Sequence, residues 1–172
     1  SIQPMSTGAL GTVYKMINSG YTGKGSVVAV VDAMMNPKHP AFKDVSNIEE
    51  VVTESNANAV KSGSYINKKI PFAWNYATND HNNLNPAKIS EGHGQHVAGI
   101  AAGNRTKLMG MDWQGVAPDA QLLLMNVTEG GNINDSAVIK AFGDALKLKS
   151  NVVNMSLGIT KAGYTNKASI DM

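Results

Sequence analysis

The sequence predicts an α/β protein built around a parallel sheet. Three short apolar runs, residues 26–33, 121–127 and 151–157, are each bounded by glycine or polar residues. Continuous apolar runs of this length are typical of strands that are buried on both faces. Between the second and third runs, residues 134–149 carry apolar side chains at helical spacing, namely Val138, Phe142, Ala145 and Leu148. This strand, helix, strand order is the crossover unit that places two parallel strands in one sheet.

The N-terminal half begins with a predicted helix near residues 8–19, followed by the turn-rich segment "NSGYTGKG" that leads into the first strand. Residues 44–91 are predicted to form a polar surface insertion within a single domain that covers residues 1–172. Within it, residues 47–63 are expected to form a surface helix. Residues 68–80 are expected to form an exposed strand with aromatic side chains at alternating positions, namely Phe72, Trp74 and Tyr76.

Two further helices are predicted in the C-terminal half. Residues 92–104 are rich in small side chains, which favour close packing against other backbone, and Gly103-Asn104 is a suitable stop. The helix over 134–149 has Asn134 or Asp135 as its N-cap and lysines at its C-terminal end.

Composition excludes several classes of function. The formal net charge of +2 and the scattered lysines give no electrostatic footprint for nucleic acid, and 6% aromatic residues give no base-stacking platform. No stretch approaches the roughly 18 apolar residues that span a bilayer, and there is no cysteine for a disulfide, thiol nucleophile or thiolate site. A first residue other than Met leads us to expect that the chain was processed or trimmed.

Asp32 is the first candidate functional residue, because it ends the apolar run "VVAVVD". An acidic residue at that point lies at the carboxyl edge of a parallel sheet, where α/β proteins gather their chemistry. The alternative is an aspartate that only forms a turn or caps a helix.

His93 and His96 are three residues apart in "GHGQHVAGI". Three interpretations compete: a metal pair, a catalytic base, and a glycine-rich turn that contains histidine by chance. A zinc site needs a third ligand at a convincing spacing, and the sequence has neither HExxH nor cysteine. His93, at the start of a helix between two glycines, suits a general base that a carboxylate such as Asp32 would orient. His96 is expected to be a core or hydrogen-bonding histidine.

A third element, "NMSLG" over residues 154–158, ends a strand in small residues. It would leave backbone groups open at the same edge of the sheet and would make a suitable pocket wall. A strand that simply leads into a loop would have the same sequence.

The order of four motifs, "VVAVVDA", "HGQHVAGI", "GVAPDAQLLLMNV" and "NVVNMSLG", resembles the first half of the subtilisin-like serine proteases over roughly residues 20–160. "KKIPFAWNY" and the long polar insertion are similar to the cell-envelope proteinase branch, the lactocepin-like and complement-cleaving peptidases of Gram-positive bacteria. The resemblance implies the N-terminal portion of a three-layer subtilisin-like fold, in a secreted or cell-wall-attached endopeptidase. It also implies a protein or peptide substrate.

The resemblance assigns roles residue by residue. Asp32 matches the triad aspartate and His93 the general base. Ser156, Leu157 and Gly158 match the segment that lines the pocket for the residue preceding the scissile bond, whereas Gly130 and Gly131 fall where a strand edge pairs with extended substrate. No cofactor is required for the chemistry. Structural calcium is common in the family, and the acidic and asparagine residues of 79–85 are candidate ligands of low specificity.

Several positions depart from the family pattern: Ala33 and Met34 replace Thr or Ser and then Gly, Gln95 replaces Thr or Met, and Asn126 replaces a basic residue. The motifs of the nucleophilic serine and the oxyanion asparagine do not occur, so we expect them on a companion chain or in a missing C-terminal part, and expect this chain alone to be inactive. The alternative is a catalytically inactive relative that binds peptide or a protein partner.

Overall fold

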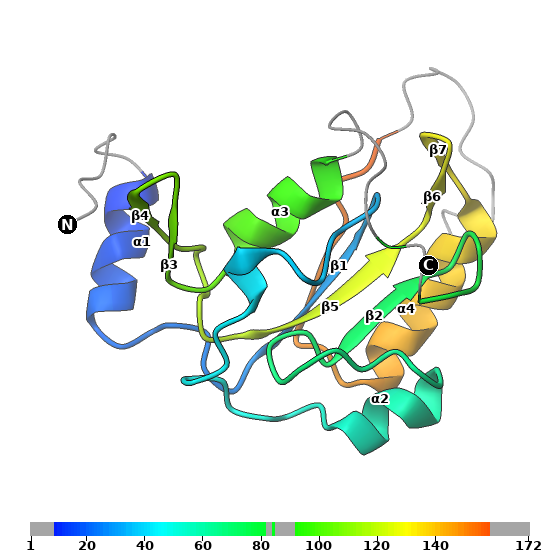
Figure 1. Ribbon diagram of the computed structural model, residues 1–172, viewed down its shortest axis with the longest axis horizontal. Helices are drawn as coiled ribbons and strands as arrows, with labels where there is room; N and C mark the ends of the chain where they lie inside the picture. The colour runs from blue at the N-terminus through cyan, green and yellow to red at the C-terminus, as the bar shows by residue number, and fades with distance from the viewer. Residues whose placement is uncertain (1–8, 82–83, 85–91, 159–172) are drawn as a thin grey trace.

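The computed structural model describes residues 9–81, 84 and 92–158. Its central feature is a four-stranded parallel sheet in the order β2-β5-β1-β8, which confirms the predicted α/β fold class (Figure 1). The four strands are β1 (Val27–Asp32), β2 (Phe72–Asn75), β5 (Gln121–Asn126) and β8 (Val152–Asn154).

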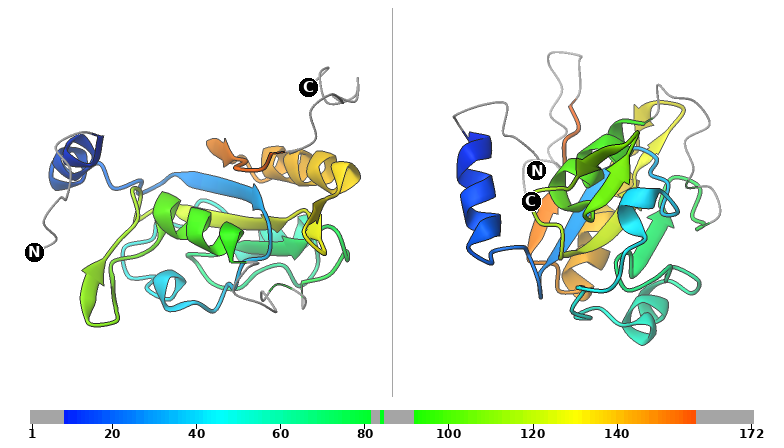
Figure 2. Two further views of the ribbon diagram at one scale, coloured as in Figure 1. Left: turned by 90° about the horizontal axis from the view of Figure 1, so that it is seen from above. Right: turned by 60° about the vertical axis from the view of Figure 1, so that its left-hand side comes forward.

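Helices cover the two faces of this sheet and produce three layers (Figure 2). On one face, α4 (Asp135–Lys147) packs on Val27, Ala29 and Val31. On the other face, α3 (His93–Ala102) packs on Val30 of β1 and on β5. Because successive strand residues point to opposite faces, a strand covered on both sides must be apolar on both, as the runs that form β1 and β5 predicted. The third run was also predicted to be buried on both faces, but β8 is a short strand at the end of the described sheet and is exposed or half-buried.

The helix boundaries follow local sequence. Asn134 is the N-cap of α4, and its side chain accepts the backbone N–H of Ala137, as predicted. Gly103 ends α3 at its C-cap. The N-terminal helix α1 runs over Ala9–Asn18, within the predicted range.

Two predictions for the segment 44–91 need correction. The predicted surface helix is reduced to α2 (Glu54–Val60), because a capping box between Thr53 and Asn56 starts it late. The predicted exposed strand is instead buried throughout as β2. Its alternating aromatics do lie on one face, against α4, but Ala73 on the other face is also buried, in the cluster beneath α3.

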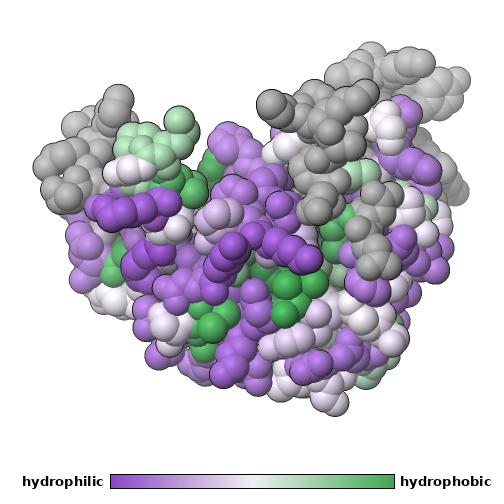
Figure 3. Space-filling model, in the orientation of Figure 1, coloured by the Kyte–Doolittle hydropathy of each residue, from purple (hydrophilic) through white to green (hydrophobic). Residues whose placement is uncertain are grey.

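Three short elements were not predicted: the 3-10 helix η1 (Pro40–Phe42) and two antiparallel hairpins. One hairpin joins β3 (Thr106–Leu108) to β4 (Met111–Trp113), and the other joins β6 (Thr128–Glu129) to β7 (Asn132–Ile133). On the face drawn in Figure 3, hydrophobic residues form small separate patches among hydrophilic ones. Within the described ranges, no helix has the length and apolar character to cross a bilayer.

Candidate active site

Asp32 lies at the carboxyl end of β1 and is completely buried. Its Oδ1 accepts the backbone N–H of Ala33 and lies 2.7 Å from Nδ1 of His93. Its Oδ2 is also buried and has no hydrogen-bond partner among the described residues. Both polar contacts of the carboxylate among the described residues are therefore made by Oδ1, with the Ala33 N–H and the His93 imidazole.

His93 is the first residue of α3, and its side chain is 55% exposed. A proton on Nδ1 makes the contact with Asp32 a hydrogen bond and leaves Nε2 as the basic nitrogen of the ring. An imidazole that is held at one nitrogen and accessible at the other is the arrangement that general-base catalysis requires. The structure thus brings together the two residues that the sequence singled out as catalytic.

The close packing around residue 94 explains why a glycine follows His93. A Cβ added at this position would lie 2.4 Å from the carbonyl oxygen of Ala33, a distance that side chains do not tolerate. The missing side chain lets the first turn of α3 approach the end of β1 closely. That approach is what brings His93 within hydrogen-bond distance of Asp32.

Gln95 makes the next contact along the same helix turn. Its Oε1 accepts the backbone N–H of Asn36 at 2.7 Å and so ties the segment after β1 to α3. The sequence showed Gln95 only as a departure from the family pattern. Its role was missed because the two partners are 59 residues apart.

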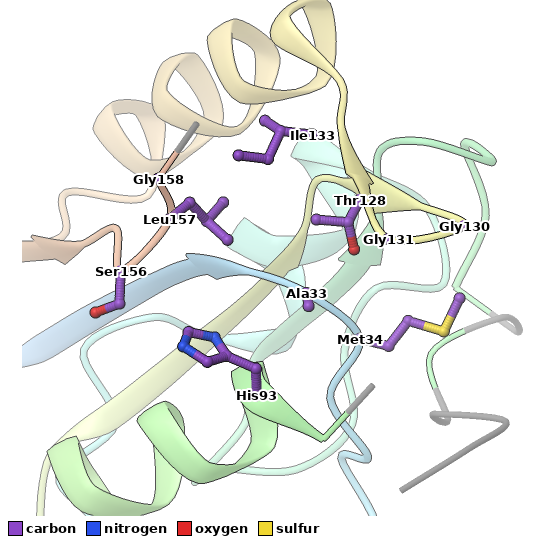
Figure 4. Close-up of a pocket in the computed structure, with 10 residues that line it drawn as sticks. All are labelled: Ala33, Met34, His93, Thr128, Gly130, Gly131, Ile133, Ser156, Leu157 and Gly158. Carbon is purple, nitrogen blue, oxygen red and sulfur yellow. The ribbon is translucent and has the colours of Figure 1, made fainter. Parts of the chain in front are cut away.

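A pocket of about 320 Å³ opens beside His93 (Figure 4). It is lined by all five residues that the sequence predicted for substrate binding, namely Ser156, Leu157, Gly158, Gly130 and Gly131. Four further lining residues had not been assigned to it: Ala33, Met34, Thr128 and Ile133. Thr128 and Ile133 follow β5 and precede α4, so their place at the carboxyl edge of the sheet was the signal that could have found them.

The predicted pocket residues come from two segments, the one that follows β8 and the turn between β6 and β7. Ser156 and Leu157 follow β8, and the hydroxyl of Ser156 donates to Oδ1 of Asn154 at 2.9 Å. Gly130 and Gly131 form the turn between β6 and β7 rather than a strand edge. Both have positive φ, 55° and 81°, which explains the choice of glycine in this tight turn.

The other histidines have separate surroundings. His96 is exposed on α3, so it is not the core histidine that was one of the two predicted alternatives, and a hydrogen-bonding role stays a prediction. His39 caps η1 through Nδ1, and burial followed by the charge of Lys43 lowers its pKa. His81 stacks on Trp74 with ring centroids 6.0 Å apart.

The described residues contain no group of three or more acidic, histidine or cysteine side chains that could hold a metal ion. Of the segment 79–85, which the sequence offered as a source of calcium ligands, residues 82, 83 and 85 lie outside the described ranges. The calcium site therefore stays a prediction.

Comparison with known proteins agrees with this geometry. The sequence profile of the subtilase family matches residues 23–171. The chain is 34% identical over 160 residues to the PI-type proteinase of Lactococcus lactis subsp. cremoris, covering 86% of this chain and 8% of that protein. It is 30% identical over 155 residues to the C5a peptidase of Streptococcus pyogenes serotype M6, covering 84% of this chain and 13% of that protein. The chain thus spans only a small part of these relatives.

Solved structures show the same fold at lower identity. The Clostridium perfringens CspB protease superposes with a TM-score of 0.57 at 21% identity, over 87% of this chain and 32% of that one. A lanthipeptide protease superposes with a TM-score of 0.54 at 20% identity, over 84% of this chain and 32% of that one.

Proposed function

The chain belongs to the subtilase family, and we propose that it supplies the acid–base half of the active site of a secreted or cell-surface serine endopeptidase. The observation that carries the proposal is the contact of 2.7 Å between Asp32 and His93 at the mouth of an open pocket. Serine proteases of unrelated folds use this pair in the same way, with the carboxylate orienting the imidazole.

His93 acts as the general base. Its Nε2 takes the proton from a nucleophilic serine as that serine attacks the substrate carbonyl, and later returns the proton to the leaving amine. Asp32 holds the ring in the tautomer that leaves Nε2 basic and stabilises the imidazolium once it forms. The chemistry needs no metal or other cofactor.

Ser156, Leu157 and Gly158 bind the substrate residue that precedes the scissile bond, and the turn at Gly130 and Gly131 flanks the same pocket. Supporting this, all five residues line one pocket together with His93. An extended peptide is the substrate shape that such an open pocket at the edge of a sheet accommodates.

The nucleophilic serine and the oxyanion donor come from a companion chain or a C-terminal continuation. Ser156 lies on the pocket wall with its hydroxyl donating to Asn154, which does not suit a nucleophile. The surroundings of β8 support a missing partner: among the described strands it pairs only with β1, and Val152 in β8 and Met155 directly after it are 55% and 47% exposed. Apolar side chains at a free sheet edge favour further pairing.

The test is labelling of the assembled protein with a fluorophosphonate, which reacts with an activated serine, followed by a denaturing gel. We expect label on a segment or chain that carries the serine, and a decrease of about 10⁴-fold or more in the labelling rate for His93→Ala. His96→Ala is the matched control, because His96 is an exposed histidine of the same helix. It should label at the wild-type rate.

Two other outcomes would contradict the proposal. Equal labelling of wild type and His93→Ala would show that His93 is not the base. An assembled protein that takes no label, but binds peptides with an affinity that falls on Leu157→Ala, would indicate an inactive relative that retains only the pocket.

A further inference from the structure

We propose that Met34 is a specificity-determining residue that selects one substrate side chain at the end of the pocket opposite Leu157, and that Gln95 positions it. The inference rests on the proposed function, because it concerns the substrate of the same site. Met34 lines the pocket beside His93, and the sequence had marked it only as a departure from the family pattern.

The backbone on either side of Met34 is held in place by α3. Asp32 contacts His93, Ala33 packs against Gly94, and the N–H of Asn36 binds Gln95. Three consecutive residues at the start of α3 therefore fix the segment that follows β1. Met34 lies between these held residues, so the position of its backbone at the pocket wall is fixed.

Met35 contributes to the same anchoring from the core side. Its side chain is fully buried in the cluster that includes Phe42 and Ala98, and its Cγ would lie 3.0 Å from a Cβ at residue 94. Met34, in contrast, is among the residues that line the pocket, and in Figure 4 its side chain extends away from His93 toward the turn at Gly130.

The pocket has two ends. In Figure 4, Ser156 and Leu157 lie on one side of Ala33, whereas Met34 lies on the other side, toward the turn at Gly130. An extended peptide advances by about 3.3 Å per residue and alternates its side chains. The two ends therefore receive side chains from different substrate residues.

At its own end, Met34 limits the space. The turn across from it contributes glycines, and a Cβ at Gly130 or Gly131 would meet nothing within 4 Å. Among the described lining residues, Met34 is thus the large side chain that bounds this end. Its side chain takes up space at this end, so small aliphatic substrate side chains fit there more easily than an aromatic ring does.

The experiment uses the assembled protease and fluorogenic peptides in which each position around the scissile bond is varied in turn. For Met34→Ala we expect kcat/KM for aromatic relative to small aliphatic side chains to rise about tenfold at one position only. Leu157→Ala should change the preference at a different position. Met109→Ala is the control, because Met109 is 97% exposed on the β3–β4 hairpin, outside the pocket.

The role of Gln95 is tested by a pair of variants. Gln95→Met removes the acceptor for the N–H of Asn36 at nearly constant size, and we expect it to weaken selectivity at the Met34-dependent position, with a change in KM larger than that in kcat. Gln95→Glu keeps an acceptor oxygen and should restore the selectivity. A purely structural loss of stability would lower activity on all peptides alike.

Active Met34→Ala with an unchanged preference at every position would overturn the inference and leave the proposed function intact. The inference would also be overturned if Met34→Ala and Leu157→Ala changed the preference at the same peptide position. If Met34→Ala does not fold, Met34→Val removes part of the volume while keeping an apolar side chain, and an unchanged preference in that variant would overturn it too. A wild-type protein that neither takes the fluorophosphonate nor cleaves any peptide would overturn both proposals.

Discussion

Two helical glycines have opposite surroundings. Gly94, in the first turn of α3, sits against the carbonyl of Ala33 with no room for a methyl group, whereas a Cβ at Gly143 in α4 would meet nothing within 4 Å. The same residue type therefore serves close packing at one position and weakens a helix at the other.

We expect Gly94→Ala to lower the free energy of unfolding by roughly 1–3 kcal/mol, because the added methyl forces α3 away from β1. Gly143→Ala should raise it by about 0.5–1 kcal/mol, since alanine restricts the unfolded chain without a clash. Urea unfolding of both variants measures the two values. Equal effects in the two variants would contradict the packing described here.

At the scale of elements, buried polar side chains attach the segment 51–70 to the start of β5. The amide of Gln121 accepts the N–H groups of Val51 and Val52 at 3.0 and 2.7 Å and donates to the carbonyls of Val52 and Lys68. The Nζ of Lys69, a fully buried residue, donates to the carbonyls of Pro118 and Ala120. These bonds fix the N-terminal end of the sheet, opposite the site.

Burial lowers the pKa of Lys69 from 10.5 to about 7. Between pH 7 and 10.5 the unfolded state therefore binds more protons than the folded state, so stability rises with pH across that window and is level below it. The slope should approach about 1.4 kcal/mol per pH unit. Urea unfolding from pH 6 to 10 measures this slope. Lys69→Met should remove the contribution of Lys69 to it. If the same slope remains in Lys69→Met, another titrating group causes the pH dependence.

Tyr76 connects the end of β2 to α4, because its hydroxyl donates to Oδ2 of the buried Asp144 at 2.8 Å. Burial, followed by the charge of Asp144, raises the pKa of Tyr76, so the phenol stays protonated as a donor. We expect Tyr76→Phe to cost about 1.5–3 kcal/mol, the range for a hydrogen bond to a charged group. Thermal unfolding should show no comparable loss for Tyr21→Phe, because Tyr21 is 71% exposed.

Sequence patterns identified most elements but not all of their surroundings. The runs that became β1 and β5 have only one stable environment, a strand covered on both faces, so they were predictable. The aromatic alternation in β2 indicated one covered face and could not show that the intervening Ala73 is covered too. Lys69 looks like an exposed lysine in sequence, because its carbonyl partners lie about 50 residues away.

The site was predicted to a similar extent. Asp32 and His93 could be paired because a strand end and a glycine-flanked helix start both lie at the carboxyl edge of a parallel sheet. Gln95 could not be given its role, since its partner is a backbone N–H whose position depends on the tertiary fold. The order of the strands is likewise a tertiary property, which single-sequence patterns do not contain.

For the whole molecule, the sheet has an open side at β8, which pairs with β1 alone among the described strands. Exposed apolar residues at such an edge favour association with other chains. We expect this chain alone to self-associate, and Val152→Lys to reduce that association, as measured by sedimentation velocity.

The matched control is Leu146→Lys. Leu146 is another exposed apolar residue, but it lies on α4 and not on the edge strand. Equal reduction by both variants would attribute the association to surface hydrophobicity in general rather than to β8.

The position of β1 in the middle of the sheet also has a consequence for synthesis. The N–H of Val27 donates to the side chain of Asn151, 124 residues further along the chain, and the strand's other neighbour begins at Gln121. At 5–20 residues per second, β1 leaves the ribosome roughly ten seconds before either neighbour exists. Fragments that end before Gln121 should therefore be digested rapidly by added protease, whereas those that extend beyond Asn151 should gain protection. Equal protection of both would show that β1 becomes ordered without its neighbours.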